Sequence, residues 1–211
     1  MDSRTNDWIC LMNSDAVQKA VRHCAEVLNE KFRGKKIIAV CILKGAAFFY
    51  VDLVRLLNMS CSCYFIEATS YHDNQHGGPL NIMSSIEPSK FVEREVIIID
   101  ELYDNGRTLL EMCEAIHQKA HVPYERIFTT TLFRKNKKTA FPPPDLFGAW
   151  VPNVWLVGCG LDDKQEKRGW TSLWGVPKTD PSQKTEDDRI FTDTDYRDKI
   201  IPRLNMGTYS P

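Results

Sequence analysis

The alternation of apolar and polar positions predicts buried strands that alternate with helices. Four short runs rich in apolar residues and β-formers have the length of strands, at 35–43, 62–71, 96–100 and 126–133. Apolar residues recur at helical spacing from Val17 to Leu28 and from Leu109 to Ala120, and segment 45–57 is apolar nearly all round, as expected for a helix buried against a sheet. This order favours an α/β fold with a parallel sheet covered on both faces.

The remaining segments are less regular. The stretches "LFGAW" (146–150) and "VWLVGCG" (154–160) predict two further short strands. Periodicity is lost from 72 to 95, where we expect no regular element, and a connection of that length is usually functional or mobile. The tail from Pro177 onward is polar and rich in turn residues, although its "IIPRL" (200–204) could dock on the domain or on a partner.

Composition and charge exclude several classes of protein. A length of 211 residues suits a single domain, and the net charge of -1 provides no field toward nucleic acid or membranes. The N-terminus does not resemble a secretory signal, and no apolar run is long enough to span a bilayer. The cysteines are odd in number, lack zinc-site spacing and suit a reducing compartment, so we expect a cytoplasmic protein. They are Cys10, Cys24, Cys41, Cys61, Cys63, Cys113 and Cys159.

The stretch "VIIIDELYDNGRTL" (96–109) carries the strongest chemical signal. An apolar run leads into Asp100 and Glu101, then Asp104, and then a turn with a glycine and a threonine at 105–108 before the next helical pattern. Ligands of parallel sheets bind at the carboxyl ends of the strands. A small, hydroxylated turn at a helix N-terminus is an anion site, because its backbone N–H groups point outward and the helix dipole favours negative charge.

The three acids beside this turn allow two interpretations. Carboxylates do not bind phosphate, so they suit ribose hydroxyls, a metal ion or a cation that forms on the substrate. Phosphate next to ribose is the pattern of a ribose 5-phosphate site. In the structural alternative, Asp104 and Asn105 only cap the helix, and Asp100 and Glu101 lie on a solvated strand end. One motif does not decide between them, but further motifs favour the ribose phosphate site.

Four stretches occur in the order typical of one family. The stretch at 96–109 resembles the phosphoribosyl diphosphate (PRPP) signature of type I phosphoribosyltransferases, and the chain more closely resembles the hypoxanthine-guanine phosphoribosyltransferases. The resemblance implies an α/β fold with a parallel twisted sheet flanked by helices and one domain over 1–211. It also implies a small purine-binding hood formed by the N-terminal and C-terminal segments and a mobile loop at about 70–95. The four stretches are "CILKGAAFF" (41–49), "TSY" (69–71), "VIIIDELYDNGRTL" (96–109) and "VWLVGCGLDDKQEKRGW" (154–170).

The resemblance also implies roles for the residues of the PRPP half of the site. Asp104 is expected to be the general base or the hydrogen-bond partner of purine N7, and the Leu43–Lys44 peptide is expected to be cis. The mobile loop is expected to begin at Ser70 and Tyr71. The PRPP phosphate and ribose are assigned to Asp100, Glu101, Asn105, Gly106, Arg107 and Thr108, pyrophosphate to Lys44, Gly45 and Arg168, and Mg²⁺ to Asp162, Asp100 and Glu101.

The purine half is assigned in the same way. Trp155 is expected to stack on the base, and backbone groups of Leu156 and Asp162 to read its edge. An ungapped alignment places Arg134 where the family has its purine-reading lysine, with Lys135 beside it, and both remain candidates. The chain departs from the family by its Asp-Glu order at 100–101, usually Glu-Asp, and by Asn105 and Arg107, where threonine and lysine are common.

The implied activity is a Mg²⁺-dependent transfer of 5-phosphoribose from PRPP to N9 of guanine or hypoxanthine, with release of pyrophosphate. A xanthine-using transferase is one alternative. A PRPP-sensing regulatory protein that binds nucleic acid is another, but the charge of -1 and the absence of a basic stripe argue against it. The resemblance further implies a homodimer or homotetramer whose partners are PRPP and a 6-oxopurine, with neither nucleic acid nor membrane.

Overall fold

The computed structural model describes residues 7–70, 80–82, 86–178 and 180–207. A six-stranded sheet forms the centre, in the order β4-β3-β2-β5-β6-β7. Five of its strands are parallel neighbours, and β4 alone is antiparallel, paired with β3. These strands are β2 (Lys36–Leu43), β3 (Ser60–Ser70), β4 (Leu80–Ile82), β5 (Glu95–Tyr103), β6 (Ile127–Lys135) and β7 (Leu146–Val151). The predicted parallel α/β sheet is confirmed.

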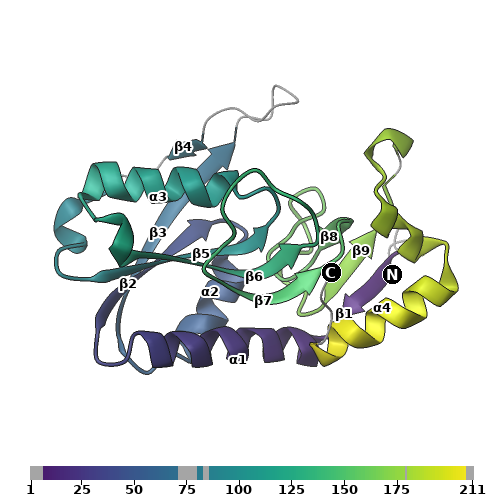
Figure 1. Ribbon diagram of the computed structural model, residues 1–211, viewed down its shortest axis with the longest axis horizontal. Helices are drawn as coiled ribbons and strands as arrows, with labels where there is room; N and C mark the ends of the chain where they lie inside the picture. The colour runs from purple at the N-terminus through teal and green to yellow at the C-terminus, as the bar shows by residue number, and fades with distance from the viewer. Residues whose placement is uncertain (1–6, 71–79, 83–85, 179, 208–211) are drawn as a thin grey trace.

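Helices cover both faces of this sheet. Figure 1 shows α3 (Arg107–Ala120) on one face and α1 (Ser14–Lys31) and α2 (Ala47–Val54) on the other. The apolar run of β5 is continuous because its side chains alternate between two cores: Val96 and Ile98 pack with the α3 side, and their neighbours at 97 and 99 pack with the α1 and α2 side. Burial on both faces leaves the strand ends as the place for polar side chains.

A second, antiparallel sheet brings the two ends of the chain together, in the order β1-β9-β8. Its strands are β1 (Ile9–Met12), β9 (Leu173–Val176) and β8 (Trp155–Val157). Beside it lies α4 (Thr194–Met206), whose Asn205 donates from Nδ2 to the carbonyl of Leu11 at 3.0 Å. Short 3₁₀ turns complete the described chain, at Pro88–Lys90, Tyr124–Arg126, Pro181–Gln183 and Glu186–Phe191. No described helix has the length and apolar character to cross a membrane.

Several sequence predictions need correction. Neither β1 nor β9 was predicted, and the tail expected to be turn-rich contains the 13-residue α4, which buries Ile200 and Leu204 of "IIPRL". Helix α2 is not buried all round, since Phe48 and Val51 are 44% and 41% exposed. Within 72–95, where no element was expected, the structure has β4 and the turn at Pro88–Lys90.

The rest of that connection concerns the predicted mobile loop. Ser70 is the last residue of β3, and only its backbone is described. Tyr71 and the segments 71–79 and 83–85 lie outside the described residues. The loop at about 70–95 therefore stays a prediction.

Two loops meet at the carboxyl edge of the large sheet and require glycines there. Gly160 has φ +102°, and a Cβ added to it would lie 2.1 Å from the carbonyl oxygen of Gly45. The loop after β2 and the loop after β8 therefore touch through backbone atoms. This contact joins the small sheet to the large one at the edge where the predicted site residues gather.

Gly160→Ala is expected to destabilise the protein more than Gly34→Ala. Gly34 also has a positive φ, +72°, but a Cβ there would meet no atom within 4 Å. Gly34→Ala therefore measures the backbone cost alone, about 1–2 kcal/mol, whereas Gly160→Ala adds a collision with backbone. Urea unfolding of both variants measures the difference, and equal losses would contradict the close contact of the two loops.

Candidate active site

The ends of β2, β5 and β6 place the predicted residues along one edge of the sheet. Lys44 directly follows β2, Asp104 follows β5, and Lys135 is the last residue of β6. Strand β5 was predicted to end at Asp100 but continues to Tyr103, so Asp100 and Glu101 lie within the strand. The two outer strands flank β5 in parallel register, which gathers residues that are far apart in the sequence.

The turn between β5 and α3 has the geometry of an anion site. Gly106 adopts φ +89°, and α3 begins at the next residue. The side chain of Asn105 accepts a hydrogen bond from the backbone N–H of Arg107 at 3.0 Å, whereas the N-cap residue of α3 is Gly106, which has no side-chain cap. Arg107 itself is paired with Glu111 at 2.6 Å. Thr108 lies in the first turn of α3, where backbone N–H groups and the helix dipole favour an anion.

The acid pair Asp100–Glu101 favours the binding of a positively charged group. Asp100 is buried, with 8% of its surface exposed, and its Oδ1 accepts the backbone N–H of Glu101 at 3.0 Å. Burial raises the pKa of Asp100 well above its usual range, and the neighbouring charge of Glu101 adds to the rise. The Glu101 carboxylate lies against Gly45, where a Cβ would come within 2.0 Å of its Oε1. A side chain at position 45 would therefore displace the Glu101 carboxylate from this place.

The acid pair is a suitable but incomplete ligand set for a hard cation. Its carboxylate oxygens are the donors that Mg²⁺ prefers. In the described part of the chain, no group of three or more His, Cys, Asp or Glu side chains could hold a metal ion. A metal ion at this edge would therefore take most of its ligands from a bound molecule and from water.

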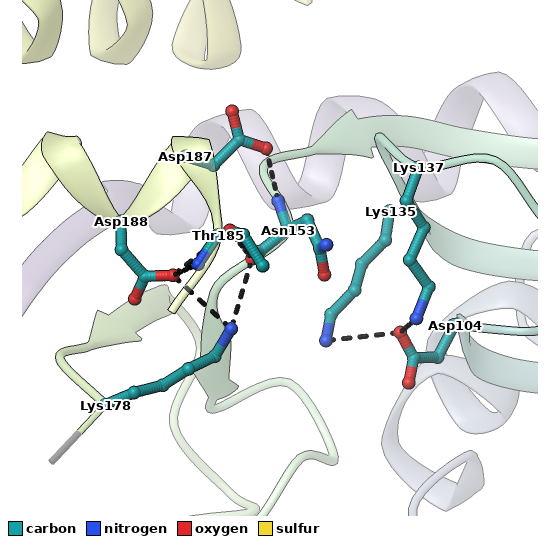
Figure 2. A network of polar contacts seen from close by, with 8 residues as sticks. All are labelled: Asp104, Lys135, Lys137, Asn153, Lys178, Thr185, Asp187 and Asp188. Carbon is teal, nitrogen blue, oxygen red and sulfur yellow. Dashed lines mark hydrogen bonds and ion pairs between the residues drawn. The ribbon is translucent and has the colours of Figure 1, made fainter. Parts of the chain in front are cut away.

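Asp104 is held by two lysines (Figure 2). Its Oδ1 lies 3.2 Å from the Nζ of Lys135 and 2.7 Å from the Nζ of Lys137. Burial alone would raise the pKa of Asp104, but the two ammonium groups outweigh it and the pKa is lowered. Burial lowers the pKa of Lys135, and Asp104 opposes that shift without cancelling it. Asp104 is therefore an ionised carboxylate at neutral pH, and it does not cap α3.

The structure separates the two candidates for the purine-reading cation. Successive residues of a strand point to opposite faces, and Arg134 and Lys135 are the last two residues of β6. The Arg134 guanidinium lies over the Trp150 ring, 4.3 Å from its centroid, whereas Lys135 pairs with Asp104. Lys135, and not Arg134, is therefore the cation next to Asp104.

The loop after β8 is tied together by its own charges. Arg168 pairs with Asp162 at 2.7 Å and donates to the carbonyl of Gly160 at 2.8 Å. The two residues predicted to contact pyrophosphate and Mg²⁺ are thus partners of each other. The same loop contacts Gly45 and so lies next to the Leu43–Lys44 peptide. This peptide bond is cis, as predicted. The Lys44 side chain is 68% exposed, with its Nζ 4.0 Å from Glu67.

Trp155 and Leu156 are the first two residues of β8, in the small sheet. Trp155 is 54% exposed, an unusual state for a large aromatic ring, while Leu156 is buried. An exposed ring on an anchored strand is available for stacking on a flat ligand.

Lys137 was missed by the sequence analysis. It lies in the basic stretch "RKNKK" (134–138), which reads as a solvated loop. The pairing with β7 continues one residue past β6, with Asn136 N–H donating to the carbonyl of Val151 at 2.8 Å, and the next residue is Lys137, whose Nζ lies 2.7 Å from Asp104 Oδ1. Only the spacing of two residues from Lys135 offered a local signal for a shared partner.

A parallel α/β sheet with an anion-binding turn and an acid pair at its carboxyl edge defines a class of phosphorylated-ligand binding domains. The profile of the phosphoribosyl transferase domain matches residues 11–164, which is 154 of the 211 residues. The chain therefore belongs to the phosphoribosyl transferase family.

Individual relatives agree with this assignment. The chain is 29% identical to a hypoxanthine-guanine-xanthine phosphoribosyltransferase of Tritrichomonas foetus over 154 residues, covering 72% of this chain and 82% of the relative. It is 26% identical to a hypoxanthine-guanine phosphoribosyltransferase of Staphylococcus aureus, covering 74% and 86%. The crystal structure of a hypoxanthine phosphoribosyltransferase from Staphylococcus aureus superposes with a TM-score of 0.71 at 25% identity, over 88% of this chain and all of that one.

The ion pairs of Asp104 generate a prediction on the pKa of Lys135. Asp104→Asn is expected to lower this pKa further, because Asp104 is the group that raises it against burial. Lys137→Ala is expected to raise it, because the Lys137 charge lowers it. NMR titration of the Lys135 ammonium measures both shifts. Shifts of the same sign in the two variants would contradict the arrangement of one carboxylate between two lysines.

Proposed function

We propose that the protein is a purine-salvage enzyme that transfers 5-phosphoribose from PRPP to N9 of guanine or hypoxanthine, forming GMP or IMP and pyrophosphate. The observation that carries this proposal is the pair of Asp104 and Lys135 beside the turn 105–108, which joins a carboxylate and an ammonium donor to an anion site. The names of the relatives, which specify hypoxanthine and guanine, support the choice of base.

The PRPP half of the site follows from the turn and the acid pair. Backbone N–H groups of the turn 105–108 other than that of Arg107, which Asn105 accepts, bind the 5-phosphate, and Thr108 adds a hydroxyl donor. Asp100 and Glu101 accept hydrogen bonds from the ribose hydroxyls. Both acids also stabilise the positive charge that develops at ribose C1 as the bond to pyrophosphate breaks, because their carboxyl groups are already in place at the strand edge and Asp100 is buried.

The purine half uses the ion pair and the small sheet. Asp104 accepts the proton of purine N7, or a hydrogen bond from it, and its two lysines keep it ionised. Lys135 donates to the exocyclic O6, since an ammonium is a donor only. Trp155 stacks on the base, and the backbone at Leu156 and Asp162 reads the edge that bears the N2 amino group of guanine.

The leaving pyrophosphate lies between the two loops that meet at Gly45 and Gly160. Lys44 and Arg168 supply positive charge there, and Asp100, Glu101 and Asp162 are the carboxylates that could hold Mg²⁺. When bound, this ion neutralises charge on the diphosphate. We further propose that Ser70 and Tyr71 begin a loop that closes over the site, and that the enzyme is a cytoplasmic homodimer or homotetramer.

Asp104→Asn is expected to lower kcat by about 10²–10⁴-fold while PRPP binding is retained, because the substitution removes a base and leaves the phosphate turn intact. Steady-state kinetics and PRPP titration measure the two effects. Asp163→Asn is the matched control, since Asp163 is paired with Lys167 in the loop after β8. Activity of Asp104→Asn within about threefold of wild type, well below the loss typical of a general base, would refute its role.

The base preference is the second test of this function. Guanine is expected to be used, hypoxanthine as well or less, and adenine excluded, because the 6-amino group of adenine would face the Lys135 cation. Xanthine belongs in the same assay, since the Tritrichomonas foetus relative is named for it. Lys135→Ala should raise the KM for purine and spare that for PRPP, whereas Arg134→Ala should spare both. Turnover of adenine, or the reverse order of the two variants, would show the purine site to be wrongly placed.

A further inference from the structure

The last part of the chain lies beyond the family match and forms hydrogen bonds to Asn153, which is close in the chain to the purine-binding residue Trp155. The match ends at residue 164, so residues 165–211 have no place in it. From this region Lys178 and the segment 185–188 contact Asn153, in the turn between β7 and β8 (Figure 2). In the figure, Asn153 lies between these contacts and the ion pair of Asp104 with Lys135.

Asp188 organises the contacts to the Asn153 carbonyl. It is buried, with 7% of its surface exposed, and its Oδ2 accepts the backbone N–H of Thr185 at 2.7 Å. The Thr185 hydroxyl lies 2.8 Å from the Asn153 carbonyl oxygen and 3.0 Å from Asp188 Oδ2, and donates to one of them at a time. The Nζ of Lys178 lies 3.4 Å from Asp188 Oδ2 and 3.5 Å from the Asn153 oxygen. Asp188 thus holds both donors that face this carbonyl.

Asp187 holds the other side of the same residue. Its Oδ2 accepts the backbone N–H of Asn153 at 2.7 Å, and its Oδ1 accepts the hydroxyl of Tyr196, in α4, at 2.9 Å. Both backbone polar groups of Asn153 are therefore bound by residues of the C-terminal segment. Two adjacent carboxylates, one for the N–H and one for the donors to the C=O, fix the peptide planes of the turn.

Asn153 is placed where a shift would affect the base and not PRPP. Two residues after it, Trp155 starts β8. Two residues before it, Val151 ends β7 and accepts the N–H of Asn136, the residue after Lys135. The turn therefore connects the stacking ring to the strand end that carries the base-reading lysine. The anion turn at 105–108 and the acid pair lie on β5 and α3, outside this connection.

We propose that Asp187 and Asp188 are positioning residues for purine binding: they clamp Asn153 and so set the distance and angle between Trp155 and Lys135. This inference rests on the proposed function. The C-terminal segment then supports purine-binding residues that themselves lie within the matched domain. The charge of Lys178 also acts at the site. It lowers the pKa of Lys135, although its effect is smaller than those of burial, Asp104 and Lys137.

The test compares steady-state kinetics of Asp187→Ala and Asp188→Ala with wild type, using guanine and PRPP as varied substrates. Each variant is expected to raise the KM for guanine about tenfold, which corresponds to a loss of ~1.4 kcal/mol of binding free energy. The KM for PRPP and kcat at saturation are expected to stay within about twofold of wild type, because the clamp touches neither PRPP nor the reacting atoms. A merely structural role would move both KM values or lower kcat.

Glu186→Ala is the matched control. Glu186 directly precedes Asp187 and Asp188, but its side chain is 84% exposed and pairs at the surface with Arg189. This variant should keep the KM for guanine. Asp188→Asn guards against failure of the alanine variant to fold, because its amide oxygen still accepts the Thr185 N–H while the charge for Lys178 is lost. Its KM for guanine should lie between those of wild type and Asp188→Ala.

The outcomes separate this inference from the proposed function. If wild type forms no nucleotide from any of the four purines, the proposed function fails and the clamp has no role in it. If wild type is active but the two alanine variants keep the KM for guanine, or raise the KM for PRPP equally, the inference is overturned. An equal effect of Glu186→Ala would overturn it too. A selective rise for guanine in Asp187→Ala, Asp188→Ala and, to a smaller extent, Asp188→Asn supports it.

Discussion

The burial of β5 on both faces is the constraint on which the rest of the structure depends. A strand between two apolar cores has room for polar side chains only at its ends, and its parallel neighbours β2 and β6 end at the same edge. Lys44, the acid pair at 100–101, Asp104 and Lys135 reach that edge from three strands. The candidate site residues gather at this edge because both faces of β5 are covered by apolar side chains.

Two carboxylate environments arise within five residues of β5 and its end. Asp100 is buried beside another acid and its pKa is raised, whereas Asp104 lies between two ammonium groups and its pKa is lowered. The first environment attracts positive charge from a ligand, and the second keeps a base ionised while presenting a donor next to it. Opposite shifts in neighbouring acids are a common way for one site to divide its roles.

The candidate site draws on two layers of the molecule. The anion turn and the acid pair belong to the large sheet and α3, while Trp155 and Leu156 belong to a small sheet built from both ends of the chain. The loops meet through the backbones of Gly45 and Gly160, and the C-terminal segment holds the turn at Asn153. PRPP and purine binding can therefore respond separately to substitutions, even though the ligands are to react with each other.

The sequence by itself determined the parallel sheet, the turn at 105–108 and the family, because long apolar runs and a contiguous motif are local signals. Even the implied cis peptide before Lys44 agreed with the structure. Tertiary structure alone decided the pairing of β1 with β9 and the docking of α4, since strands of four residues have too short a pattern to reveal a partner about 160 residues away. It also decided that Lys135 and not Arg134 meets Asp104, because the face to which a strand residue points depends on register. Lys137 and the clamp on Asn153 were likewise beyond the sequence, since contacts between distant polar residues leave no periodic trace along the chain.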